Sequence, residues 1–96
     1  MSYGVDNWLS VVTEPQDLFA RRLAVELGAD WQYTKTTVVV EVSEALSAEV
    51  SLCLDGDIRV GLSGLSNEYR RFEDGPDGAK LAASFIRETL THERTA

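Results

Sequence analysis

Side chains that commonly serve in catalysis are sparse in this sequence of 96 residues. The only histidine, His92, follows the last apolar position of an expected C-terminal helix, where an imidazole would lack a rigid support and an orienting carboxylate. A serine or cysteine nucleophile would need this one histidine as its base, and no Gly-x-Ser-x-Gly segment is present to expose a serine. We therefore expect a protein that is not an enzyme.

The single cysteine, Cys53, falls on the outward side of an expected strand. It has two interpretations, a small packed residue or a reactive thiol. One cysteine can form neither an internal disulfide nor a multi-cysteine metal site, which fits a reducing cytoplasm.

Acidic side chains gather at two turns and could offer oxygen ligands to a hard cation. The first group flanks a glycine and the second surrounds a proline: Asp55 and Asp57, then Glu73, Asp74 and Asp77. Turn formation and helix capping explain both groups locally, and the spacing of a twelve-residue calcium loop is absent. We expect neither a metal ion nor a cofactor.

Sixteen acidic residues against nine basic ones give a net charge of −7. Such a charge repels phosphate backbones and anionic membranes, so the expected partner is another protein rather than nucleic acid or a membrane. The charge serves either solubility or steering toward a basic protein.

No basic segment followed by an apolar core begins the chain, and no stretch approaches the roughly 20 apolar residues that cross a bilayer. We expect a cytoplasmic protein, and seven arginines against two lysines favour a bacterial or phage source.

Residues 13–28 predict an amphipathic helix. Thr13 and Gln16 have the spacing of a capping box, and Gly28 can adopt the left-handed conformation that ends a helix. The apolar positions recur at i, i+4 and i+8, at Phe19, Leu23 and Leu27. The preceding residues 6–12 fit either a helical turn or a short strand.

Three further segments predict strands. Residues 31–42 are rich in β-branched side chains and predict one long strand, after which residues 43–48 form a loop or a short helical turn. Residues 49–62 predict a β-hairpin about Asp55 and Gly56. Its aliphatic side chains share one face: Val50, Leu52, Leu54, Ile58, Val60 and Leu62. Residues 68–73 predict a short, charged edge strand.

Residues 79–90 predict a second amphipathic helix, and residues 1–5 and 92–96 are expected to be frayed. Together the elements predict one α+β domain over residues 1–96. Its sheet is small and antiparallel, with three to four strands and two helices packed on one face, in the order α-β-β-β-(β)-α.

Six residues are candidates for a protein-binding interface. The outward face of the expected strand at residues 31–42 carries Trp31, Tyr33 and Val39, and this face is either exposed or covered by the segment around Trp8. In the edge strand, Tyr69 precedes Arg70 and Arg71, whose side chains face opposite sides of the sheet. We expect one arginine to pair with acidic side chains and the other to project from the surface. This second group is either a solvated edge or a binding hot spot. The candidates are Trp31, Tyr33, Val39, Tyr69, Arg70 and Arg71.

The element order, small size and acidity resemble those of type III secretion chaperones and of immunity proteins that neutralise toxins. That resemblance implies a cytoplasmic binding protein built on a small α/β sandwich. We expect a protein-binding module, homodimeric, acting as a chaperone, immunity protein or inhibitor. The alternatives are an inhibitor whose acidic side chains imitate nucleic-acid phosphates, and a small enzyme or ligand-binding domain.

Overall fold

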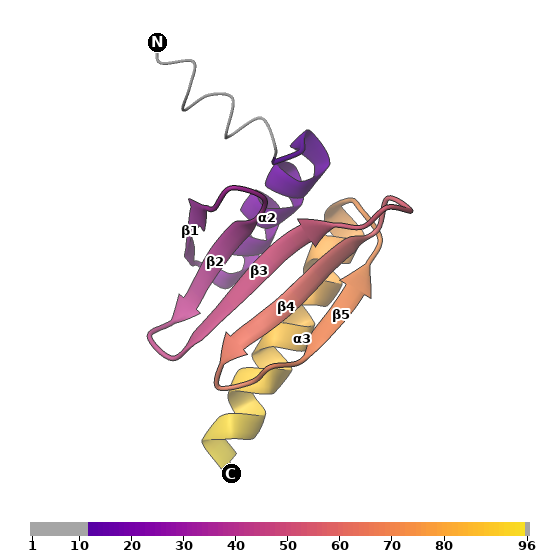
Figure 1. The fold of residues 1–96 in the computed structure, drawn as a ribbon. Coiled ribbons are helices and arrows are strands. Elements are labelled where there is room, and N and C mark those ends of the chain that lie inside the picture. The colour runs from indigo at the N-terminus through magenta and orange to yellow at the C-terminus, as the bar shows by residue number, and fades with distance from the viewer. Residues whose placement is uncertain (1–11, 96) are drawn as a thin grey trace.

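The computed structural model describes residues 12–95 (Figure 1). Trp8 and nearly all of the segment 6–12 lie outside these residues, as do residues 1–5. The elements, in chain order, are α2 (Glu14–Leu27), β1 (Asp30–Tyr33), β2 (Val38–Ser43), β3 (Leu46–Leu52), β4 (Ile58–Gly64), β5 (Tyr69–Phe72) and α3 (Pro76–Thr95).

The strands form one antiparallel sheet in the order β1-β2-β3-β4-β5, so each strand pairs with its neighbours in sequence. Both helices lie side by side behind this sheet, on one of its faces (Figure 1). The predicted α+β class and helix placement are confirmed. The number of strands is five rather than three to four.

The additional strand arises because residues 31–42 do not form one strand. Thr34 donates its N–H to the Thr37 carbonyl at 2.9 Å, and its hydroxyl accepts the N–H of Thr37 at 3.0 Å. Threonine side chains can close a turn in this way, in competition with extended backbone. The chain therefore reverses over residues 34–37, and β1 pairs with β2 as a hairpin.

Residues 43–48, expected as a loop or helical turn, form a tighter reversal. Only Glu44 and Ala45 lie between β2 and β3, and the Ser43 hydroxyl accepts the N–H of Ala45 at 3.3 Å. Leu46 therefore begins β3 and is buried.

The capping box that begins α2 is confirmed. The hydroxyl of Thr13 accepts the N–H of Gln16 at 3.3 Å, and Gln16 Oε1 accepts the N–H of Thr13 at 3.2 Å. Gly28 ends the helix with φ of 63°. The side chain of Gln16 is itself buried, and its amide donates to the carbonyls of Thr36 at 2.8 Å and Val50 at 2.7 Å. These bonds fasten the start of the helix to the sheet.

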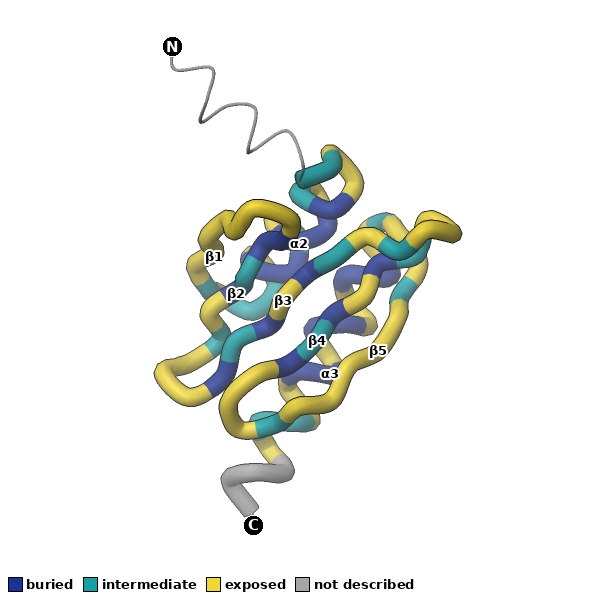
Figure 2. Tube along the Cα trace, viewed as in Figure 1, coloured by how far each residue is buried: buried dark blue, intermediate teal, exposed yellow. Residues whose placement is uncertain are grey.

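The core lies between the helices and the sheet, and most of the predicted aliphatic residues belong to it (Figure 2). The predicted hairpin of β3 and β4 is also confirmed, with Cys53 donating its N–H to the Asp57 carbonyl at 2.8 Å. Two members of its predicted face are outside the core. Leu52 is 37% exposed at the end of β3, and Leu54 is fully exposed in the turn.

The last helix is longer than expected. Its backbone runs from Pro76 to Thr95, beyond both ends of the predicted segment 79–90. No glycine or proline stands after residue 90 to end the helix. Among the described helices, none has both the length and the apolar character needed to cross a membrane.

Candidate functional site

The six candidate interface residues do not share one surface. Trp31 lies opposite Val40 and Tyr33 opposite Val38 in the β1–β2 ladder, and opposite residues project to the same side of a sheet. Val38 and Val40 are buried beneath the helices, so the two aromatic residues lie on the helix side. Val39 projects to the other side. The expectation that Trp31, Tyr33 and Val39 share a face is wrong, because the turn at 34–37 reverses the chain between them.

Trp31 and Tyr33 belong to a cluster that we call the β1 aromatic edge, completed by Asp17 and Arg21 of α2. The Tyr33 hydroxyl donates to Asp17 Oδ1 at 2.7 Å and accepts from Arg21 Nη2 at 3.2 Å. Arg21 Nε lies 3.2 Å from Asp17 Oδ2, and its guanidinium lies 5.7 Å from the Trp31 ring centroid. The Tyr33 hydrogen bond and the Asp17 carboxylate raise the pKa of Arg21. Trp31 and Tyr33 remain 37% and 41% exposed.

Arg70 and Arg71 face opposite sides of β5, as predicted. Arg71 lies opposite Arg59 on the side away from the helices, and it pairs with the carboxylates of Asp55 and Asp57 in the neighbouring hairpin turn. Arg70 lies on the helix side, where its guanidinium is 4.5 Å from the ring centroid of Phe85. Arg70 is therefore not part of the face that carries Arg71.

The Asp55–Arg71 ion pair adds to the hydrogen bonds that hold the turn between β3 and β4. Asp55 Oδ1 accepts the backbone N–H of Asp57 at 3.1 Å, and this bond together with Arg71 lowers the pKa of Asp55. The two aspartates thus have the local role that the sequence indicated. Within the described part of the chain, no three His, Cys, Asp or Glu side chains gather as a metal site would require.

The side of the sheet opposite the helices, which we call the uncovered face, has no described element packed over it (Figure 1). One row of opposed residues crosses all five strands on this face: Gln32, Val39, Glu49, Gly61 and Tyr69. Tyr69 is 59% exposed, and the guanidinium of Arg59 lies 4.3 Å from its ring centroid. In Figure 2 the sheet lies in front of the helices, and exposed positions occur along its strands.

A hollow of about 280 Å³ lies beside Tyr69 on the uncovered face, over Gly61. Polar side chains line most of it, including Glu49, Arg59 and Asn67. Gly61 contributes no side chain, which leaves room between Glu49 and Tyr69. The candidate interface residues did not include Arg59 or Gly61, although the alternation of the β-hairpin places both on its outward side.

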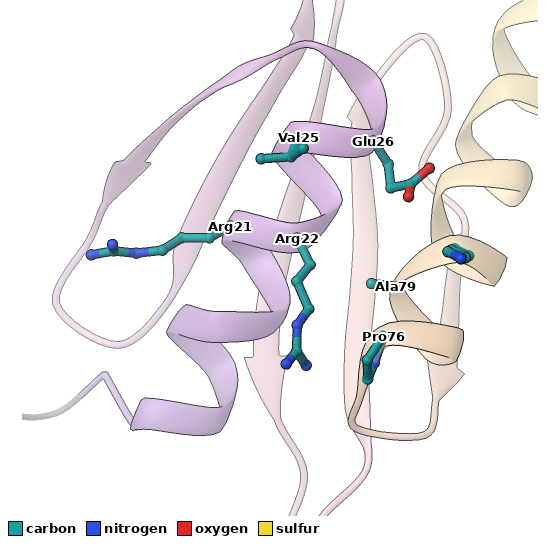
Figure 3. A pocket seen from close by; sticks show the side chains of 7 residues that line it. Arg21, Arg22, Val25, Glu26, Pro76 and Ala79 are labelled. Carbon is teal, nitrogen blue, oxygen red and sulfur yellow. The ribbon is translucent and has the colours of Figure 1, made fainter.

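A second hollow, of about 290 Å³, lies between the two helices on their outer side (Figure 3). Val25, Pro76 and Ala79 line it together with Arg22 and Glu26, whereas the guanidinium of Arg21 extends away from it toward β1. A third, of about 340 Å³, adjoins Tyr33 at the start of α2. These volumes fall near the lower end of the roughly 300–1,000 Å³ that is common for small-molecule sites.

Comparison with known proteins gave no match: no family model fits the chain, and neither a curated protein nor a solved structure shows significant similarity to it.

Proposed function

We propose that this protein is a non-catalytic, cytoplasmic protein-binding module of a bacterium or phage, acting as a chaperone, immunity protein or inhibitor. It engages its partner protein through the uncovered face of the sheet. The observation that carries the proposal is the exposed pair of Tyr69 and Arg59 beside the hollow over Gly61. Tyrosine and arginine are enriched among the residues that dominate binding energy at protein interfaces.

The geometry of this pair suits a binding contact. With the Arg59 guanidinium 4.3 Å from the Tyr69 ring centroid, each side chain limits the rotation of the other before a partner arrives. Less side-chain entropy is then lost on binding. The adjoining hollow offers space for a projecting side chain of the partner, with the Glu49 carboxylate and the Arg59 guanidinium available to hydrogen-bond it.

The distribution of charge favours a protein partner over imitation of nucleic acid. Asp30 and Glu41 lie opposite each other on β1 and β2, whereas Arg59 and Arg71 lie opposite each other on β4 and β5. A face with both signs of charge differs from the continuous acidic surface that a phosphate mimic presents to a basic groove. Complementary charges of both signs would instead fix the orientation of a protein partner.

Photocrosslinking tests this proposal. A photoreactive phenylalanine analogue replaces Tyr69 in the native cell, and the matched control carries it in place of Ser84, an exposed residue of α3. We expect a crosslinked partner protein from position 69 and not from position 84. The Arg59→Ala substitution should reduce the yield from position 69. Equal yields from both positions, or a product from position 84 alone, would exclude the uncovered face as the binding surface.

A further inference from the structure

The outer edge of β1 carries backbone groups that pair with no described strand. Thr34, directly after β1, donates its N–H to the carbonyl of Thr37, directly before β2, so the backbone of this position bonds toward β2 and continues the register of the ladder. Hydrogen-bonded pairs alternate with non-hydrogen-bonded ones along an antiparallel ladder. Gln32 therefore bonds toward β2, whereas Trp31 and Tyr33 direct their N–H and C=O groups outward. No described strand lies beyond β1 to receive them.

The same two residues carry the half-exposed rings of the β1 aromatic edge. An unpaired edge with exposed aromatic side chains is a template for another strand. One antiparallel arrangement of two copies of β1 uses all the outward groups of both strands. It places Trp31 opposite Tyr33 of the second copy, and Tyr33 opposite Trp31, with Gln32 facing Gln32 on the twofold axis.

We propose that a second copy of this chain occupies the edge, so that two β1 strands pair about a twofold axis at Gln32. Each Trp31–Tyr33 pair exchanges both of its backbone hydrogen bonds, and the rings form aromatic cross-strand pairs on the helix side. An isologous contact of this kind closes on itself and ends with a dimer.

Charge complementarity also favours a second copy. Because the strands run in opposite directions, Asp30 of one copy lies opposite Thr34 of the other and beside its Lys35. Asp30, the acidic residue that begins each β1, thus lies near Lys35, the basic residue just beyond the end of the other copy's β1. The resulting sheet continues through both copies, with all helices on one side. Both uncovered faces then form a single surface on the other side.

Disulfide trapping tests the register. In a Cys53→Ser background, Gln32→Cys places two cysteines opposite each other in a non-hydrogen-bonded pair. Their Cα atoms would be about 4.5 Å apart, within the range of roughly 4.4–6.8 Å that a disulfide spans. Ser63→Cys in the same background is the control, because Ser63 is exposed on β4, away from β1. We expect a covalent dimer under mild oxidation from Gln32→Cys alone.

The mass in solution tests the association itself. We expect the unmodified protein to have twice the chain mass of 10.6 kDa by light scattering across a dilution series. Replacing Trp31 and Tyr33 together by serine should halve that mass while the circular dichroism spectrum is retained, and Tyr69→Ser should not. A monomeric unmodified protein would overturn the proposal, and the β1 edge would then be a site for a different protein. A dimer that is trapped through Ser63→Cys, or that survives the double serine change, would overturn it as well.

Discussion

At the scale of single residues, the side chain of Gln16 joins the start of α2 to two parts of the sheet. Its amide is buried and donates to the carbonyls of Thr36 and Val50. We expect Gln16→Leu to lower the free energy of unfolding by about 1–3 kcal/mol, because the Val50 carbonyl loses a buried donor and the Thr36 carbonyl loses a partly buried one. Chemical denaturation measures this change.

Thr13→Ala is the matched control for Gln16→Leu. It removes the hydroxyl that caps α2 but keeps the bonds of Gln16 to the sheet, and it should cost about 1 kcal/mol. A cost for Gln16→Leu no larger than that of Thr13→Ala would mean that the two carbonyl bonds contribute nothing to stability.

Asp55 gives a second prediction at this scale. Its pKa is lowered in the folded protein, so the carboxylate contributes stability above its unfolded pKa, and the contribution is lost as the pH falls through the folded value. We expect the Asp55 carboxyl to titrate below the ordinary value of 3.8 in NMR spectra. In Arg71→Gln the midpoint should rise part of the way, because the Asp57 N–H bond remains. A midpoint that Arg71→Gln leaves unchanged would contradict the pairing.

At the scale of elements, Leu52 and Ile58 form a matched pair, because they lie opposite each other in the β3–β4 hairpin and lose the same number of carbons on change to alanine. Ile58 is fully buried, whereas Leu52 is 37% exposed. We expect Ile58→Ala to cost about 2–5 kcal/mol in unfolding free energy, and Leu52→Ala clearly less, because no cavity forms at an open site. Equal costs would place Leu52 in the core after all.

The elements also show where sequence patterns were sufficient. Alternation about the Asp-Gly pair predicted the β3–β4 hairpin, and the capping box and Gly28 predicted both ends of α2, because these signals are local. The pattern failed at Thr34 to Thr37. β-Branched residues favour strands, but here two threonines close a turn with their hydroxyls and backbone groups.

That one turn changed the candidate site. Because β1 folds back on β2, Trp31 and Tyr33 lie on the helix side of the sheet. Of the six predicted residues, only Val39, Tyr69 and Arg71 lie on the uncovered face. The contacts of Arg59 with Tyr69, and of Gln16 with Val50, join segments distant in the chain. Their geometry depends on strand register and helix packing, which local patterns do not encode.

At the scale of the whole molecule, the helices cover one face of the sheet and leave two separate surfaces for association. The uncovered face presents Arg59 and Tyr69, and the outer edge of β1 presents Trp31 and Tyr33. In the proposed dimer these surfaces do not compete, because the edge pairs the two copies while both faces remain open. Changes at the edge should therefore alter mass in solution, and changes on the face should alter partner binding.

Calorimetric titration of the crosslinked partner tests most directly whether the uncovered face binds a protein. Gly61→Val fills the hollow, and a Cβ atom added at this position meets nothing closer than Tyr69 Cβ at 3.9 Å, so the fold should tolerate it. We predict a Kd raised at least about 30-fold by Gly61→Val and by Tyr69→Ala, which corresponds to the roughly 2 kcal/mol of a hot-spot residue. Val25→Ser, in the groove between the helices, should leave the Kd unchanged. An unchanged Kd for both face variants, with loss of binding in Val25→Ser, would contradict binding through the uncovered face.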